Sequence, residues 1–150
     1  MEHSYQCILV AVDGSFESEL AFEKGVNVAL RNQARLVLAH VIDIRRLQDI
    51  IAYDPFAEDR LEDEATAVLS AYEAQARQKG VQDIKQVVKI GKPTDLLARD
   101  IPDSEQVDLI MVGATGLNTF ERLLIGSTSE FLLRHAKVDL LVVRDTEKTL

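Results

Sequence analysis

Apolar residues along this chain gather in five short runs, separated by segments with a helical pattern. The runs cover residues 5–13, 34–43, 83–91, 107–114 and 138–144. Four of them are almost continuously apolar, which is typical of strands buried on both faces of a parallel sheet. The run at 83–91, "DIKQVVKIG", is more polar, so we expect it nearer to a sheet edge.

Helical periodicity fills the intervals between the runs. It predicts helices over residues 16–31, 55–79, 93–101 and 127–136. The second has the clearest apolar stripe, which consists of Leu61, Ala65, Val68, Leu69, Tyr72 and Ala76. The stretch 43–59 is ambiguous, and is either a loop or a short helix before the long one.

Capping residues predict where these helices begin and end. Asp54 is expected to cap the long helix, with Pro55 in its first turn and Gly80 at its end. The third helix should stop near Pro102, because proline removes a backbone donor. Ser127 and Glu130 have the spacing of a capping box at the start of the last helix.

Regular alternation of strands and helices predicts the α/β class, with helices on both faces of a five-stranded parallel sheet. A chain of 150 residues fits one domain, residues 1–150. In a doubly wound sheet of order 3-2-1-4-5, ligands bind beyond the carboxyl ends of the first and fourth strands. Asp13 ends the first of these strands and Gly113 ends the fourth.

The net charge of −8 narrows the range of partners. No basic stripe is present, so we expect neither nucleic acid nor a membrane surface as a partner. Cys7 is the single cysteine and cannot form an internal disulfide, which fits a reducing compartment. The polar start "MEHSYQ" has no signal-peptide core, and the apolar runs are too short to span a bilayer. We therefore expect a cytoplasmic protein.

The stretch "GATGLNTFERLLIGSTSE", residues 113–130, resembles a phosphate-binding loop without its lysine. Gly113 and Gly116 flank a tight turn after a strand, where glycine permits positive φ and close approach of a ligand. Gly126 then precedes small hydroxyl residues at the start of a helix, whose free amides favour phosphate. The alternative is that the glycines only form turns and that Ser127 only caps its helix.

Several segments together resemble the universal stress protein family. They are "ILVAVDGS", "LAHVID", "VGATGLNTFERLLIGSTSE" and "LLVVR". The spacing Gly113-x2-Gly116-x9-Gly126-Ser127 is similar to that of the ATP-binding branch of this family. The resemblance implies ATP binding, with Mg²⁺ held by the phosphates, and a homodimer. It does not imply a defined reaction.

The resemblance also assigns site residues. Those beside the adenine and ribose are Ala11, Val12, Asp13 and Val41, with the backbone of Val41 at the adenine edge. Those beside the ribose and phosphates are Gly113, Ala114, Thr115 and Gly116. Those at the triphosphate are Gly126, Ser127, Thr128 and Ser129.

Two departures from the family pattern matter. Thr115 stands where many members have Arg or His, which leaves one less positive group near the ligand. Val138 and Asp139 replace the Pro-Val that commonly opens the last strand. Because that strand, residues 138–143, usually forms the dimer edge, Asp139 brings a charge to the expected interface.

Catalytic groups are not evident in the sequence. His3, His40 and His135 have no metal-ligand or catalytic spacing. His40 is interpreted as a packed strand histidine, and the alternative is a position near the nucleotide, since it precedes Val41. A receiver domain would need an aspartate after the third strand, which ends "KIGKP", and "DGSFES" lacks the hydroxyl-rich loop of a flavin site. We therefore expect an ATP-binding regulatory or stress-response module, with a slow ATPase or phosphotransfer enzyme as the alternative.

Overall fold

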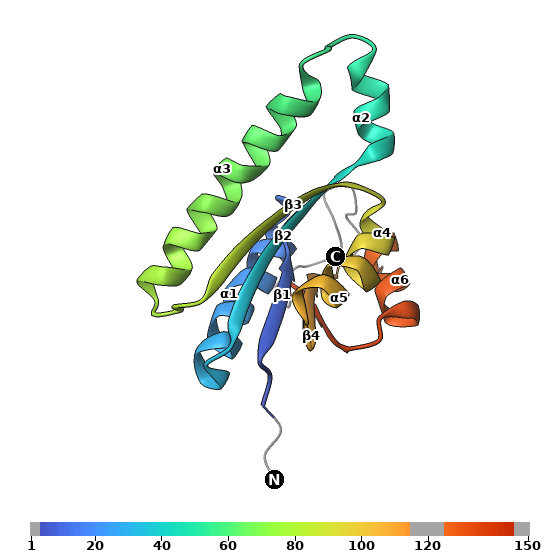
Figure 1. The fold of residues 1–150 in the computed structure, drawn as a ribbon. Helices are drawn as coiled ribbons and strands as arrows, with labels where there is room; N and C mark the ends of the chain where they lie inside the picture. The colour runs from blue at the N-terminus through green and yellow to red at the C-terminus, as the bar shows by residue number, and fades with distance from the viewer. Residues whose placement is uncertain (1–3, 115–124, 146–150) are drawn as a thin grey trace.

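The computed structural model describes residues 4–114 and 125–145, and it contains one parallel sheet of five strands (Figure 1). The strands are β1 (Cys7–Ala11), β2 (Arg35–Asp43), β3 (Ile84–Gly91), β4 (Leu109–Gly113) and β5 (Asp139–Val143). Their order is β3-β2-β1-β4-β5, and every neighbouring pair is parallel. The predicted order 3-2-1-4-5 is confirmed, with the polar strand β3 at one edge.

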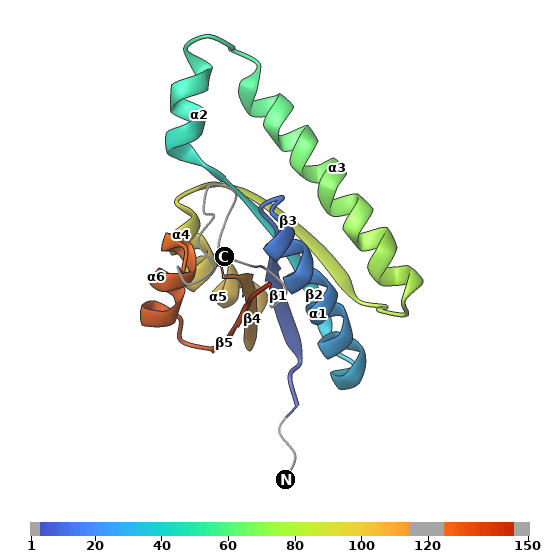
Figure 2. The ribbon, with the colours of Figure 1, turned by 180° about the vertical axis from the view of Figure 1, so that it is seen from behind.

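Helices cover both faces of this sheet, as the alternation predicts. They are α1 (Phe16–Asn32), α2 (Ile44–Ile51), α3 (Ala57–Gln78), α4 (Pro93–Asp95), the π-helical turn η1 (Leu96–Asp100), α5 (Ile101–Glu105) and α6 (Ser127–His135). Figures 1 and 2 show α1 and α3 on one face, and α4, α5 and α6 on the other.

The core is split by the sheet into two layers that follow the pleat of the strands. Ile8 and Val10 of β1 pack into the layer under α1 and α3, while Leu9 packs into the opposite layer, and all three are 0% exposed. The rings of Phe22 and Tyr72 lie 4.5 Å apart and join α1 to α3. Burial on both faces explains why β1 is a continuous apolar run in the sequence.

Cys7 lies in the second of these layers. Its thiol contacts the carbonyl oxygen of Glu105 at 3.5 Å, and burial raises the pKa of Cys7 to about 11. The thiol therefore remains protonated at neutral pH and behaves as a small hydrophobe.

Two predicted caps are wrong. The long helix α3 is preceded by a turn in which Asp54 accepts the N–H of Phe56, so the N-cap is Phe56 and not Asp54. At α6 the N-cap is Gly126, without a side-chain cap, so Ser127 does not form the predicted capping box. In both cases the chain turns one or two residues away from where the side-chain pattern indicates. The end of α3 is confirmed, because Gly80 follows it with φ of 111°.

The prediction that the third helix stops near Pro102 is also wrong. Helical backbone continues from Pro93 to Glu105. A proline ring normally clashes with the carbonyl four residues before it. Here the wider turn η1 lies directly before Pro102 and moves that carbonyl, which lets the helix pass the proline.

The ambiguous stretch contains the short helix α2, capped by Asp43 through the N–H of Arg45 at 2.9 Å. With α3 it forms a helical hairpin that projects beyond the carboxyl ends of β2 and β3 (Figure 1). A small apolar cluster of Ile42, Leu47, Ala57 and Leu61 holds the base of this hairpin against the sheet. The hairpin thereby becomes a wall at the edge of the sheet where ligands bind in this fold.

Helix α1 packs unusually close to the sheet at Gly25. A Cβ added there would lie 2.6 Å from Cγ2 of Val10. We expect Gly25→Ala to lower the free energy of unfolding by about 1–3 kcal/mol, because overpacking exceeds the gain in helix propensity. Chemical denaturation measures the change. Lys24→Ala, on the exposed face of the same helix, is the control and should change stability by less than about 0.5 kcal/mol. A stabilised Gly25→Ala variant would contradict this packing argument.

Candidate functional site at the carboxyl ends of the strands

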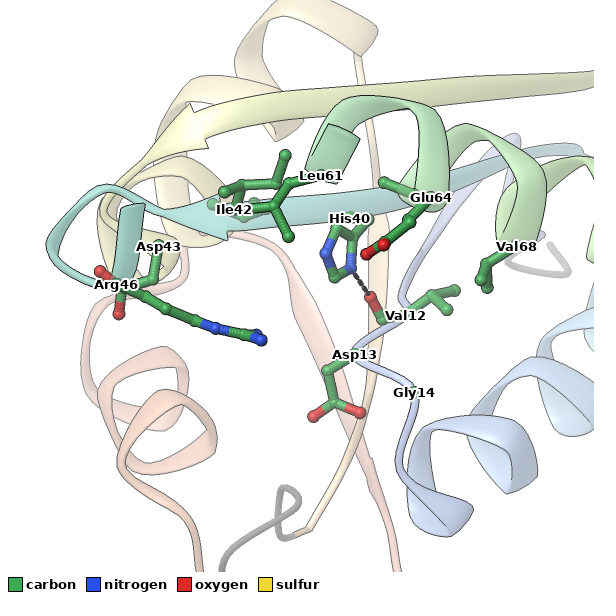
Figure 3. Close-up of a pocket in the computed structure, with 12 residues that line it drawn as sticks. Val12, Asp13, Gly14, His40, Ile42, Asp43, Arg46, Leu61, Glu64 and Val68 are labelled. Carbon is green, nitrogen blue, oxygen red and sulfur yellow. Dashed lines mark hydrogen bonds between the residues drawn. The ribbon is translucent and has the colours of Figure 1, made fainter. Parts of the chain in front are cut away.

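A cavity of about 350 Å³ lies beyond the ends of β1 and β2, between the sheet and the α2–α3 hairpin (Figure 3). Its apolar wall consists of Val12, Val41, Ile42, Leu61, Ala65 and Val68. Its polar lining consists of Asp13, His40, Asp43, Arg46 and Glu64. An apolar cavity of this size with a few convergent polar groups is typical of small-molecule sites.

The turn after β1 places Asp13 at this cavity. Its Oδ1 accepts the N–H of Ser15 at 2.8 Å, and Gly14 between them has φ of 84°. Ser15, not Asp13, caps α1, because its Oγ accepts the N–H of Ser18 at 3.1 Å. The carboxylate of Asp13 therefore does not cap α1, and it is exposed at the cavity (Figure 3).

His40 contacts the same turn from β2. Its Nδ1 lies 2.6 Å from the carbonyl oxygen of Val12 (Figure 3). A carbonyl only accepts, so Nδ1 carries the hydrogen in this contact and Nε2 remains as the second polar atom of the ring. His40 is half-buried, and it is also part of the cavity lining. His40 thus packs on its strand and also lies at the cavity, so its position agrees with both interpretations that the sequence allows.

Three of the four residues predicted to lie beside the adenine and ribose line the cavity, and one does not. Val12, Asp13 and Val41 line the cavity together. Ala11 is not part of the lining; its side chain packs with the layer on the opposite face of the sheet, as that of Val41 also does, but Val41 lies nearer to the end of its strand. Only the backbone of Ala11 remains near the strand end, where it pairs with Ala39 of β2.

At the end of β4, Gly113 does not have the backbone conformation that the turn prediction expects. Its φ is not positive, and a Cβ added there would lie 2.8–2.9 Å from backbone atoms of Glu17 and Ser18. Glycine is required because the start of α1 packs directly against the end of β4. This contact fixes the position of the Asp13 turn relative to β4.

Backbone bonds tie the end of β4 to the start of α6. Gly126 donates its N–H to the carbonyl of Ala114 at 2.7 Å, and Ala114 donates its own to Val143 at 2.8 Å. The Ser129 hydroxyl donates to the carbonyl of Gly113 at 2.7 Å. The same hydrogen cannot be donated to a phosphate, so this side chain positions the helix start. Thr115 and Gly116 lie outside the described residues.

The first turn of α6 is the other part of the site. Gly126 has an extended backbone, with φ of −64° and ψ of 159°, and no side chain caps the helix. The amides at the start of an uncapped helix are free to bind an anion. Ser127 is exposed here and Thr128 is half-buried.

Sequence reasoning missed several residues of the cavity, among them Arg46, Glu64 and Val68. Arg46 comes from the stretch that the sequence leaves ambiguous, and Glu64 lies on α3 beside the predicted stripe. Val68 belongs to that stripe, but it is 45% exposed because it faces the cavity and not the core. The apolar stripe of α3 is wider than packing against the core requires. This extra width is the one feature of the sequence that could have indicated an apolar wall at the cavity.

Comparison with known proteins identifies the family of this chain. The sequence pattern described as "Universal stress protein family" matches residues 4–144. The chain therefore belongs to the universal stress protein family, as its motifs predict.

Individual relatives cover nearly the whole chain. A protein of Staphylococcus aureus (strain USA300) that carries the universal stress protein name is 40% identical over 144 residues, which are 96% of this chain and 87% of the relative. Universal stress protein UspA from Lactobacillus plantarum is 30% identical, with a TM-score of 0.79, over 95% of this chain and 100% of that one. A universal stress protein solved in complex with cAMP is 27% identical, with a TM-score of 0.69, over 95% and 98%.

Among the described residues, no helix combines the length and the apolar character needed to cross a membrane.

The bond between Ser129 and Gly113 predicts a difference between two neighbouring serines. Ser129→Ala leaves a carbonyl at the strand end without its partner, so we expect the free energy of unfolding to fall by about 1–2 kcal/mol. Ser127→Ala is the matched control on the same turn, and should change stability by less than about 0.5 kcal/mol because Ser127 is exposed. Urea denaturation of both variants tests this, and equal effects would remove the positioning role of Ser129.

Proposed function

We propose that this universal stress protein is a cytoplasmic ATP-binding module that regulates a stress response. The cavity between the ends of β1 and β2 is the observation that carries the proposal, because its apolar wall and the exposed carboxylate of Asp13 suit a nucleoside. The uncapped start of α6 follows the end of β4, where it suits an anionic group attached to that nucleoside.

The adenine would lie in the apolar part of this cavity. Val12 and Val41 supply strand-end walls, while Leu61, Ala65 and Val68 supply the helix wall. The backbone donor and acceptor around Val41 would recognise the adenine edge, which does not require a charged side chain. A carboxylate accepts hydrogen bonds from hydroxyl groups, so Asp13 is suited to the ribose.

The phosphates would bind the first turn of α6, where Ser127 and Thr128 supply amides and hydroxyls, while Gly126, whose own N–H is donated to Ala114, leaves room for their approach. The described residues contain no group of three or more His, Cys, Asp or Glu side chains that could hold a metal. Mg²⁺ would therefore be carried mainly by the phosphates, for which it supplies charge neutralisation. Asp13 is the cavity carboxylate suited to order its water shell.

The related protein in complex with cAMP supports an adenine nucleotide as the ligand class. ATP is preferred here because the glycine spacing from Gly113 to Ser127 is similar to that of the ATP-binding branch. The cavity lining contains no lysine of the kind that phosphoryl-transfer sites use. We therefore propose retention of ATP as a regulatory signal, and not rapid turnover.

We also propose a homodimer through β5, which is an edge strand of the sheet. The carbonyl of Val143 accepts from Ala114 of β4, so alternation directs the backbone groups of Leu140 and Val142 to the free edge. Two copies could satisfy these groups by pairing around a two-fold axis. Asp139 accepts the Tyr5 hydroxyl of its own chain at 2.7 Å, which raises the pKa of Tyr5 and disperses the carboxylate charge.

Calorimetry tests the nucleotide proposal directly. Wild-type protein should bind ATP more tightly than GTP, and Gly126→Val should weaken ATP binding by at least about tenfold, roughly 1.4 kcal/mol. The branched side chain would obstruct the approach of phosphate to the backbone. Circular dichroism of the variant shows whether it is folded. A folded Gly126→Val protein with unchanged affinity would remove this segment from the site, and equal affinities for ATP and GTP would refute adenine recognition.

Mass spectrometry of the ligand released from the protein after incubation with ATP tests turnover. ADP in this released ligand would favour the ATPase alternative.

Sedimentation velocity at tens of micromolar tests the dimer. Val142→Pro removes an N–H directed to the free edge and keeps the bonds to β4, which edge strands tolerate. We expect this variant to be monomeric while the wild type is dimeric, with a similar thermal unfolding curve after allowance for the lost interface. A monomeric wild type would show that the edge does not pair in this protein.

A further inference from the structure

Arg46 lies at the cavity with its position fixed by the helix that carries it. It belongs to α2, whose neighbouring residue Leu47 is 5% exposed and packs with Ile42, Ala57 and Leu61. Figure 3 shows the Arg46 side chain extending from α2 across the cavity toward Asp13. The anchored Leu47 therefore holds the helix face that presents Arg46 to the site.

The side chain of Arg46 forms no hydrogen bond or ion pair with another described residue. Its neighbour Arg45 contrasts with it, because Arg45 forms two side-chain hydrogen bonds with Asp43, at 3.3 and 3.0 Å. Arg60, across the hairpin, pairs with Asp54 at 3.0 Å. Arg46 thus keeps its donors available to a bound molecule.

Charge in the cavity also depends on this residue. Among the described residues, the lining contains the carboxylates of Asp13, Asp43 and Glu64, and Arg46 is the one arginine or lysine beside them. In a chain of net charge −8, carboxylates in this position repel a polyanion. One guanidinium among them opposes this repulsion and can donate two parallel hydrogen bonds to a phosphate.

We propose that Arg46 is a specificity residue that binds a phosphate of the nucleotide. This rests on the proposed function of the same cavity. Arg46 supplies from α2 the positive side chain that Thr115 does not supply from the glycine segment. The guanidinium recognises the charged end of the ligand, while the apolar wall recognises the base, so Arg46 distinguishes a nucleotide from its nucleoside.

Calorimetry with ATP and with adenosine separates these contributions. Arg46→Gln should weaken ATP binding about tenfold and leave adenosine binding within about twofold, because only ATP presents phosphate oxygens to the side chain. Arg46→Lys should recover part of the loss, since it keeps the charge but not the bidentate geometry. Arg31→Gln is the matched control, because it changes the net charge equally from an exposed position in the last turn of α1. It should leave both affinities unchanged.

The outcomes distinguish this proposal from the one on which it rests. Wild-type protein that binds neither ATP nor adenosine would refute the nucleotide site as a whole. Wild-type binding with equal losses of ATP and adenosine in Arg46→Gln would assign Arg46 to the base or the cavity wall, and would overturn the phosphate role. Unchanged ATP affinity in Arg46→Gln would overturn it as well. Retained adenosine affinity shows that the variant is folded.

Discussion

The site depends on the close packing of α1 against the sheet. Gly25 brings the middle of the helix against Val10 of β1, and Gly113 brings the end of β4 against the backbone of Glu17 and Ser18. Neither approach leaves room for a Cβ. Two strand ends and one helix start are thereby held in one arrangement, and the Asp13 turn that joins β1 to α1 has a defined position. The helix cannot move away from either strand without losing its buried face, so the part of the cavity wall that this turn forms is fixed.

The second wall of the cavity is formed by the α2–α3 hairpin, which contributes side chains instead of strand ends. The base of the α2–α3 hairpin is held by a small separate cluster around Leu47, and the hairpin extends past the sheet over the cavity. The rest of α3 packs into the core layer that it shares with α1, where Leu69 is fully buried and the ring of Tyr72 lies against Phe22. The site therefore combines a rigid strand-and-turn part, in which backbone groups dominate, with a helical part that supplies side chains. Recognition of the nucleotide is divided in the same way in the function that we propose.

This division explains how much the sequence could predict. The strands and their order follow from continuous apolar runs and alternation, both of which are local patterns with a strong physical cause. The backbone positions at Val12, Asp13 and Val41 follow from the strand ends. Arg46 could not be predicted, because the direction of its side chain depends on where α2 packs, and α2 lies in a stretch whose periodicity is too short to identify. The sequence also could not show why residue 113 is a glycine. A glycine that makes room for a helix distant in the sequence cannot be distinguished there from a glycine that a turn requires.

Helix ends were the least predictable elements for a related reason. Asp54 and Ser127 both have suitable side chains for capping, but each helix begins with a residue that has no capping side chain. At α6 this has a chemical consequence. A helix start satisfied by its own cap would have fewer amides to offer, whereas the N-cap Gly126 has no side chain and Ser127 does not cap the first turn. A different serine, Ser129, holds this helix start at the end of β4 through Gly113, so the free amides lie where the fold places a ligand. Availability thus comes from Gly126 and positioning from Ser129, and an acidic protein can present an anion site without a basic surface.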